Sequence, residues 1–236
     1  MTKVAFIVPS TTNKREWSSV KDTYLFNILM SELHNKPPID CDITLFVGYN
    51  IDDKIYSIME ERMTCNAIFD NFKIEWIPFN DEYKGKPTHI WNELAEVALH
   101  KGFEYMKVLG DDITLPNDAY WLTSFINKLK KNNNIGFVAG YSNNDQIPTQ
   151  FLVHKTHLDI FECVYPHEIA NWGCDNWMYD IYPTKYGLWL KDYNLFNVGG
   201  SPRYDIVWNE KYINAIVKRY KPRFNRLDFY RLKINK

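Results

Sequence analysis

Short apolar runs alternate with helical patterns along the first half of the chain, and this alternation restricts the fold more than any other feature. We expect strands at residues 4–8, 43–47, 72–77, 105–109 and 135–139. Apolar residues recur at helical spacing over 18–34, over 88–101 and from about Asn117, a good helix cap, to 129. This order predicts an α/β fold, a Rossmann-like and mainly parallel sheet with helices on both faces.

The composition fits one domain with an appendage. The 236 residues are 45% hydrophobic and 16% aromatic, which supports a sizeable core and excludes a disordered chain. No apolar stretch reaches the roughly 18 residues that a membrane span needs, and the run at 4–8 is too short for a signal peptide. We therefore expect a cytoplasmic protein without a transmembrane segment, with one domain over 1–205 and a basic, amphipathic helical extension over 206–236.

The formal net charge of −1 hides an uneven distribution. Residues 211–236 hold nine Lys or Arg and one acid, a net charge of +8, so the rest of the chain carries −9. Three interpretations stay open for this tail. It is a helix docked on the core with a solvated positive face, a binding element for an acidic acceptor such as DNA, or a peripheral contact with an anionic membrane surface.

Two adjacent acids follow the strand expected at 105–109. Ligands of open α/β sheets bind beyond the carboxyl ends of the strands, and Asp111 and Asp112 stand at such an end. Two carboxylates side by side repel each other unless a cation compensates, and hard oxygen ligands favour Mg²⁺ or Mn²⁺ shared with phosphates. The alternative is an ordinary capping turn. The sequence lacks the glycine-rich dinucleotide, P-loop and hydrolase signatures. What remains is an acid pair on an α/β sheet, the arrangement that a nucleotide-sugar enzyme would use to hold a diphosphate through a metal.

The segments 85–92 and 105–113 resemble the GT-A glycosyltransferases, and the likeness extends over about residues 3–182. Gly110-Asp111-Asp112 occupies the Asp-x-Asp motif of that fold, with Gly in place of the first Asp, and Trp91 replaces the usual Arg. The resemblance implies a nucleotide-sugar half over about 1–115 and an acceptor half over about 116–205. It further implies that Asp112 and Asp111 hold the metal and that Asp111 also contacts the ribose or the sugar.

Further contacts with the nucleotide sugar follow from the same resemblance. The first strand ends in a loop that would cradle the base and the ribose, the second strand is followed by acids that read the base, and a Gly-Lys pair would bind the pyrophosphate. An arginine in the loop 199–204 could close over the diphosphate with its forked guanidinium. An ordinary surface loop is the alternative for each. The residues implied by the resemblance are Pro9, Ser10, Thr11, Asp53 (beside Asp52), Lys86, Asn92 and Asp111. Arg203 is predicted separately, from the flexible glycines of its loop and from the way a guanidinium binds phosphate.

The catalytic base implied by the resemblance is Asp175, in the turn Trp172-Gly-Cys-Asp175. An acid at this place deprotonates the acceptor in inverting GT-A enzymes, and the competing interpretation is a helix N-cap. The block from His154 to Tyr182 resembles more narrowly the base-J-type DNA glucosyltransferases of viruses and phages. His154 and His157 are either hydrogen-bonded core residues or a source of one further metal ligand. The aromatic residues of this block form the core and a cleft wall, or stack on a sugar ring or a nucleobase.

The sequence therefore predicts a metal-dependent glycosyltransferase, a hexosyltransferase that transfers from a UDP-sugar with inversion. A hydroxymethylated DNA base, a protein side chain, a glycan and a lipid carrier all stay open as acceptors, and a viral enzyme would act in the host cytoplasm. Two other functions are compatible with the sequence. One is a nucleic-acid-binding module on a catalytically lapsed GT-A fold, and the other is a nucleotidyltransferase that releases pyrophosphate.

Overall fold

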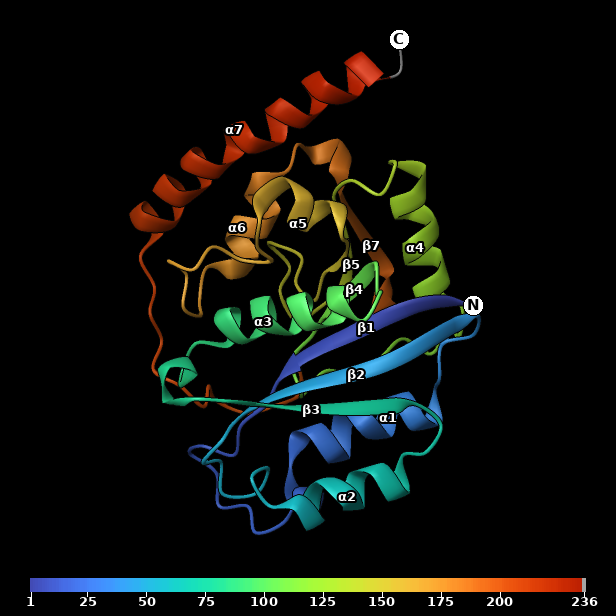
Figure 1. Ribbon diagram of the computed structural model, residues 1–236, viewed down its shortest axis with the longest axis vertical. Helices are drawn as coiled ribbons and strands as arrows, with labels where there is room; N and C mark the ends of the chain where they lie inside the picture. Colours follow the sequence, from blue (N-terminus) through green and yellow to red (C-terminus); the bar gives the residue numbers. More distant parts are fainter. Residues whose placement is uncertain (235–236) are drawn as a thin grey trace.

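A seven-stranded sheet separates two layers of helices (Figure 1). The computed structural model describes residues 1–234, with side chains up to residue 225. The strand order is β3-β2-β1-β4-β6-β5-β7, and β6 alone runs antiparallel to its neighbours. The mainly parallel α/β sheet predicted from the sequence is thereby confirmed. The strands are β1 Thr2–Pro9, β2 Cys41–Asn50, β3 Lys73–Phe79, β4 Tyr105–Val108, β5 Phe137–Tyr141, β6 Leu152–His154 and β7 Gly187–Asn194.

The central strand β1 explains why its sequence is continuously apolar. Ala5 and Ile7 point into one helical layer, whereas Val4, Phe6 and Val8 point into the other, and all five are fully buried. Successive side chains of a strand face opposite sides of the sheet, so a strand covered by helices on both sides needs apolar residues at every position.

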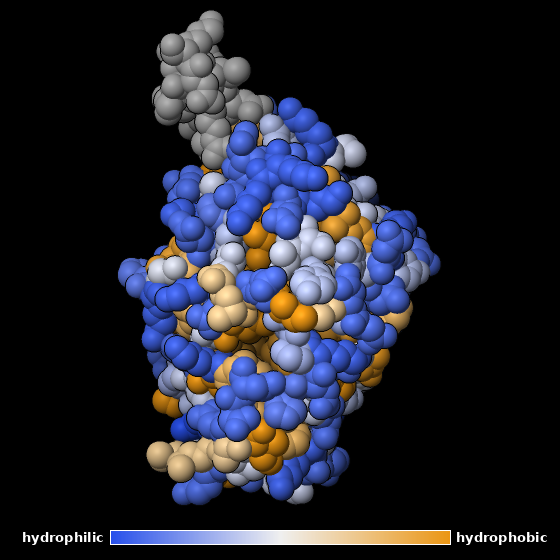
Figure 2. All heavy atoms as spheres, turned by 90° about the vertical axis from the view of Figure 1, so that its right-hand side faces the viewer, coloured by the Kyte–Doolittle hydropathy of each residue, from blue (hydrophilic) through white to orange (hydrophobic). Residues whose placement is uncertain are grey.

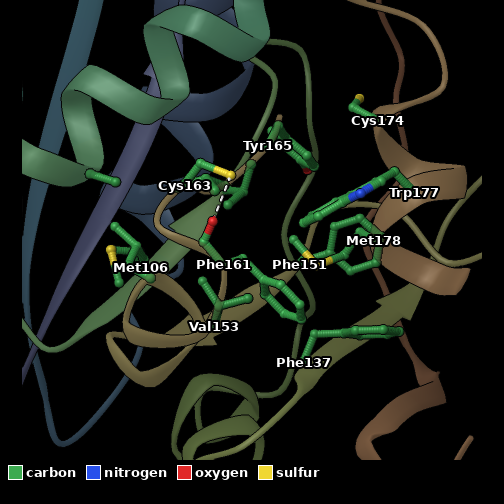
Figure 3. Close-up of a cluster of buried hydrophobic side chains, with 14 of the residues drawn as sticks. Met106, Phe137, Phe151, Val153, Phe161, Cys163, Tyr165, Cys174, Trp177 and Met178 are labelled. Atoms are coloured by element: carbon green, nitrogen blue, oxygen red, sulfur yellow. Dashed lines mark hydrogen bonds between the residues drawn. The ribbon is translucent and has the colours of Figure 1, made fainter. Parts of the chain in front are cut away.

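The first layer holds a core of large aromatic side chains. Phe137 and Phe151 of the sheet side face Phe161 and Trp177 of the helices, and the rings of Phe161 and Trp177 lie 5.5 Å apart (Figure 3). The helices of this layer are α3 Pro87–His100, α5 Thr156–Phe161, α6 Cys174–Ile181 and α7 Glu210–Ile234.

The second layer contains the helices that pack on the opposite face of the sheet. Its α4 begins at Trp121 and not near Asn117, so the expected cap was wrong. The reason is a turn at Asp118, whose carbonyl accepts from the Trp121 N–H at 3.1 Å and whose carboxylate accepts from the Tyr120 N–H at 2.9 Å. The helices are α1 Ser31–Asn35, preceded by a π-helical segment Leu25–Met30, α2 Met59–Ile68 and α4 Trp121–Lys131. Short 3₁₀ turns lie at Val20–Asp22, Asp81–Tyr83 and Thr184–Tyr186.

The described part of the basic C-terminus is docked on the first layer. Ile213, Ile216 and Val217 of α7 are buried in the same cluster as α6, whereas Trp208 and Tyr212, also at helical spacing, are exposed. Arg219 forms an ion pair with Glu168, and Arg223 one with Glu162 at 2.8 Å. These contacts match the docked-helix interpretation, although the basic side chains beyond residue 225 lie outside the described residues.

Two features test the expectation that the chain has no transmembrane segment: the distribution of hydrophobic residues on the surface and the length and hydropathy of the helices. Hydrophobic and hydrophilic residues are interspersed over the face seen in Figure 2. Within residues 1–234, no helix has the length and apolar character needed to cross a membrane.

Replacing Gly48 by Ala should destabilise the contact between β2 and α3. A Cβ at this position would lie 2.3 Å from Cγ2 of Ile90 and 2.9 Å from Cε2 of Phe79. Overpacking of this kind costs about 1–3 kcal/mol, which lowers the Tm by several degrees in thermal unfolding monitored by circular dichroism. Glu96→Ala, an exposed change on α3, serves as the control, and an equal Tm for both variants would contradict this packing.

Candidate active site

The candidate site lies where the strand order reverses, at the carboxyl ends of β1 and β4. The chain leaves these neighbouring strands toward opposite edges of the sheet, which opens a crevice between the two strand ends. The indole N–H of Trp91 lies below the crevice and donates to the carbonyls of Ile7 at 3.1 Å and Leu109 at 3.2 Å. Above it, the Ser10 hydroxyl donates to Asp111 at 2.5 Å. The two loops that follow the strands are thus held together.

Two adjoining cavities of about 580 Å³ each open from this crevice. Pro9, Pro87, Arg203 and Tyr204 line both cavities and form the boundary between them. This volume is typical of a site for a small organic ligand. The loop that joins β7 to α7, residues 195–209, supplies Arg203 and Tyr204, and we call it the closing loop.

One cavity, which we call the basic cavity, is rich in positive charge. Three acids line it against six basic residues, so its net charge is positive. The sequence-predicted residues Pro9, Ser10, Thr11, Asp53 and Lys86 all lie on its walls. The six basic residues are Lys14, Arg15, Lys54, Lys84, Lys86 and Arg203.

Asp53 shapes this cavity through contacts with its own chain. Its carboxylate accepts from the Thr12 N–H at 2.7 Å, from the Thr12 hydroxyl at 2.9 Å and from the Thr11 hydroxyl at 3.1 Å. The N–H groups of Ile55 and Tyr56 donate to it as well, both at 3.1 Å. Because its carboxylate accepts five hydrogen bonds, Asp53 fixes the backbone conformation of the loop after β1.

The other cavity, which we call the acidic cavity, collects three carboxylates that the sequence singled out. Asp111, Asp112 and Asp175 line it, and Arg203 is its basic residue. Amide and tryptophan side chains make up much of its remaining wall. These are Asn144, Gln146, Gln150, Asn171, Asn176, Asn197, Trp91, Trp172 and Trp208.

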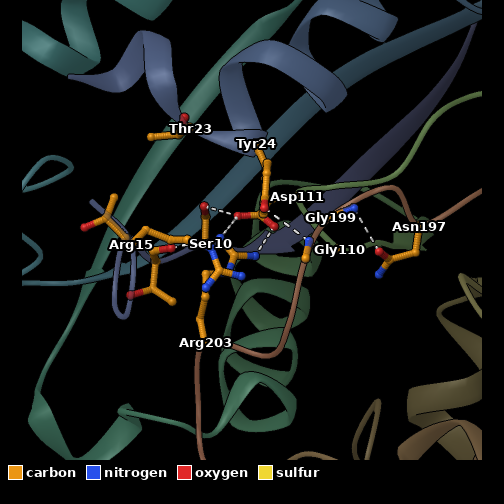
Figure 4. A network of polar contacts seen from close by, with 12 residues as sticks. Ser10, Arg15, Thr23, Tyr24, Gly110, Asp111, Asn197, Gly199 and Arg203 are labelled. Carbon is orange, nitrogen blue, oxygen red and sulfur yellow. Dashed lines mark hydrogen bonds and ion pairs between the residues drawn. The ribbon is translucent and has the colours of Figure 1, made fainter. Parts of the chain in front are cut away.

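A buried ion pair joins the closing loop to the end of β4 (Figure 4). Both carboxylate oxygens of Asp111 contact the guanidinium of Arg203, one of them at 2.7 Å from Nη1. The side chains are 1% and 12% exposed, and Arg203 also donates to the Thr11 carbonyl at 2.8 Å. Burial disfavours the charge of Arg203, but the adjacent carboxylate outweighs it, so the pKa of Arg203 is raised.

Asp112 is wedged between two glycines, which explains the departure from the Asp-x-Asp motif. A Cβ at Gly110 would lie 2.8 Å from one carboxylate oxygen of Asp112, and a Cβ at Gly199 2.0 Å from the other. A side chain at either position would therefore displace the Asp112 carboxylate. Burial and repulsion from Asp111 raise the pKa of Asp112 to about 6.

The two acids of the motif differ in how freely their carboxylates can bind a metal ion. Asp111 is engaged by Arg203 and Ser10, and within the described side chains no group of three His, Cys, Asp or Glu collects around one point. Asp112 faces the acidic cavity, and its carboxylate forms no ion pair with the side chains of residues 1–225. It fits a divalent cation that takes its other ligands from phosphate oxygens and water, which is a common arrangement for Mg²⁺.

Asp175 lies in the acidic cavity at the start of α6. The N-cap of this helix is Gly173, at φ 91°, so the interpretation of Asp175 as the cap was wrong. Burial raises the pKa of Asp175 to about 7, and in the described part of the chain no ion pair or hydrogen bond to its carboxylate opposes this. A carboxylate with a pKa near neutrality is suited to accept a proton.

Three of the residues considered in the sequence lie away from both cavities. Asn92 is buried in α3, where it donates to the Tyr165 carbonyl at 2.8 Å and accepts from the N–H groups of Val164 and Tyr165. His157 is fully buried and bonds the Tyr182 hydroxyl at 2.8 Å, and burial lowers its pKa to about 4. His154 packs on the Tyr105 ring. The structure thus gives Asn92 and both histidines internal contacts in place of contacts with a ligand.

Several residues of the site carried no signal in the sequence. Tyr204 and Trp208 line the cavities, and Gly199 lies against Asp112, only because the closing loop folds back over the strand ends. Asn171 is 3% exposed, and its contacts reach both the 83–86 turn and the closing loop. Trp91 was noted only as a departure from the usual Arg. In the sequence of the closing loop, only the glycines at 199 and 200 and the nearby Arg203 indicated a contact with the ligand.

Comparison with solved structures identifies the fold. TarS of S. aureus, a GT-A-like glycosyltransferase, superimposes with a TM-score of 0.56 at 11% identity over 94% of this chain and 43% of TarS. The protein has a GT-A-type fold. TarS 1–349 in complex with UDP-GlcNAc gives a TM-score of 0.59 at 12% identity, over 93% of this chain and 66% of that one. TarS 1–349 with UDP gives 0.53 at 13% identity, over 83% and 60%.

The GT-A-type fold is thus shown by structure and not by sequence. No protein-family model matches the chain, and no curated protein sequence matches it. The chain spans between 43% and 66% of the length of these TarS structures.

Breaking the Asp111–Arg203 pair should destabilise the protein. Asp111→Asn leaves the guanidinium without its carboxylate in a place with little access to water, and Arg203→Gln leaves the carboxylate alone. Each change should cost about 3–5 kcal/mol in urea unfolding, because removing one partner of a buried pair exposes the desolvation penalty of the other. The double variant should cost clearly less than the sum of the two, and additive costs would contradict the pairing.

Proposed function

We propose that this protein is a glycosyltransferase that moves a sugar from a UDP-sugar to an acceptor hydroxyl. One observation carries the proposal: Asp175, whose pKa is raised to about 7, lines the same cavity as Asp112, and Arg203 joins that cavity to the basic one. Glycosyl transfer requires a proton acceptor, a site for an anionic leaving group and a cavity between them that holds the sugar.

The basic cavity suits a nucleoside diphosphate. Lys86 lies just before the N-terminus of α3, and this lysine together with the helix end favours negative charge. Arg203 is placed at the boundary, where the diphosphate would pass from one cavity to the other. The complexes of TarS with UDP and with UDP-GlcNAc support a UDP-sugar as the donor.

Asp112 would hold a divalent cation, Mn²⁺ or Mg²⁺, that arrives with the diphosphate. When bound, such an ion neutralises the charge that develops on the departing nucleoside diphosphate. The chain's own contribution is to keep Asp111 paired with Arg203, so that the Asp112 carboxylate is the one left for the ion. Gly110 and Gly199 leave the space that this carboxylate occupies.

The transfer is a single displacement at the anomeric carbon of the sugar. The acceptor hydroxyl gives its proton to the carboxylate of Asp175 while its oxygen forms a bond to the anomeric carbon of the sugar. The bond between that carbon and the β-phosphate oxygen breaks, and its electron pair leaves with UDP. Attack from the side opposite the diphosphate inverts the anomeric centre, and Asp175 later loses its proton to water.

Asp112→Asn should remove the metal dependence of donor binding. Isothermal titration of the wild type with UDP-GlcNAc should show tighter binding with Mn²⁺ than with EDTA, because the ion links the carboxylate to the diphosphate. In Asp112→Asn the two affinities should become equal, with the Tm preserved. Asp52→Asn, at the rim of the basic cavity, is the matched control. Equal affinities with Mn²⁺ and EDTA in the wild type would argue against a metal at Asp112.

Asp175→Asn should abolish transfer while donor binding persists. A base in hydrogen-bond reach of its proton typically contributes about 10²–10⁴-fold to the rate, so UDP release in the presence of acceptor should fall by that order. In the wild type, the rate should rise with pH through about 7, because the carboxylate must be ionised to take the proton.

The same substitution has a signature in stability. A carboxyl whose folded pKa lies above its unfolded value of 3.8 makes the protein less stable as the pH rises from about 4 to about 7. Asp175→Asn removes this loss, so its Tm should exceed that of the wild type at pH 8 and approach it at pH 4. A variant that transfers normally, or that is less stable at pH 8, would exclude Asp175 as the base.

A further inference from the structure

We propose that Trp172 and Trp208 form a stacking platform that binds a neutral sugar ring of the acceptor, so that the acceptor is a glycan. This inference rests on the proposed function and names the substrate that would occupy the acidic cavity. Both side chains line that cavity, and each is 46% exposed. Large indole surfaces left in water at the rim of a cavity that holds the base Asp175 are suited to contact a ligand.

The platform is held in place by polar contacts. Asn171 is buried, accepts from the N–H groups of Trp172 at 2.7 Å and Val207 at 2.9 Å, and donates to the Asp205 carbonyl at 3.0 Å. This one amide therefore binds the backbone of the first tryptophan to the segment that carries the second.

Close packing positions the second ring. A Cβ at Gly173 would lie 3.0 Å from Cζ3 of Trp208 and 2.7 Å from Cδ1 of Ile213. Trp208 therefore rests against the backbone of the residue that caps α6, two positions before Asp175. Because these contacts restrain both residues without a ligand, less conformational entropy is lost when a flat partner stacks on the rings.

Before a cation binds at Asp112, the charge of the cavity disfavours acceptors that carry phosphate. Three carboxylates line it, and its one basic residue, Arg203, is already paired with Asp111. A nucleic acid or another polyanion placed on the platform would be repelled by the carboxylates. On α7, Arg219 and Arg223 are neutralised by Glu168 and Glu162, so part of the positive face of this helix is also occupied.

The polar groups of the cavity suit the hydroxyls of a saccharide. In the described part of the chain, the side-chain amides of Asn176 and Gln146 make no hydrogen bond with the protein, and both line the cavity. Amides and carboxylates bond hydroxyl groups at the edges of a sugar ring, whereas its C–H faces pack on indole. Two indole faces and free amides, with no unpaired cation among the described residues that line the cavity, favour a neutral glycan as the ligand.

The test measures acceptor binding separately from donor binding. The full chain, saturated with UDP and Mn²⁺, is titrated calorimetrically with a panel of neutral trisaccharides built from glucose, galactose, mannose or GlcNAc. At least one should bind. Trp172→Ala and Trp208→Ala should each weaken its binding by about tenfold, the value expected for loss of one stacking contact, and leave UDP-GlcNAc affinity unchanged.

Two further variants separate stacking from a folding defect. Trp172→Phe keeps a flat ring at the same place and should recover much of the affinity lost in Trp172→Ala. Tyr179→Ala removes an aromatic residue of α6 that is 41% exposed but outside the cavity, and it should bind the trisaccharide as the wild type does. In transfer assays the loss should fall on the KM for the acceptor more than on kcat.

Three results would overturn the platform. One is the binding of UDP-GlcNAc without binding of any neutral trisaccharide, and another is equal trisaccharide affinity in wild type, Trp172→Ala and Trp208→Ala. The third is stacking on DNA: binding of a duplex with 5-hydroxymethylcytosine that is lost in both alanine variants, while no sugar binds. Failure of the proposed function looks different, because UDP-GlcNAc would then neither bind nor release UDP with any acceptor.

Discussion

The Asp111–Arg203 ion pair is the contact on which the arrangement of the site depends. It ties the closing loop to the end of β4, at the switch point of the sheet, in a place that water hardly reaches. Without this contact the loop would lose its buried charged anchor over the crevice and, among ion pairs of the described residues, would keep only the exposed one of Asp205 with Lys14. The boundary between the two cavities would also lose Arg203. The pair also gives the two acids of the motif different roles, because Asp111 is bound to Arg203 whereas Asp112 faces the cavity.

The first half of the fold was predictable from the sequence because its information is local. Strands buried on both faces are mostly apolar, and β1, β2 and β4 were found for that reason, although β2 contains the buried Thr44 and β4 the buried Lys107. By contrast, α2 buries only Cys65, β6 has three residues and β7 is nowhere fully buried, so none of them leaves a clear periodic pattern.

The site was predictable to the extent that position in the sheet decides it. Asp111 and Asp112 follow a strand end, and the rule for open sheets places them at the ligand crevice. Asn92 matched the motif in sequence, but its hydrogen bonds reach Tyr165, 73 residues away, and only the folded chain reveals that partner. Gly199 acquires its importance from a carboxylate 87 residues earlier, a distance in sequence that no local pattern spans.

Asn171 gives the two cavities a common mechanical link. Besides its contacts near the tryptophans, it donates to the carbonyl of Gly85, which lines the basic cavity, at 3.0 Å. A ligand that tightens this amide's bonds on one side stiffens the backbone on the other. By thermodynamic linkage, if bound donor raises the affinity for the acceptor by some factor, bound acceptor raises the affinity for the donor by the same factor. The two substrates of such a protein would be coupled through a single buried side chain.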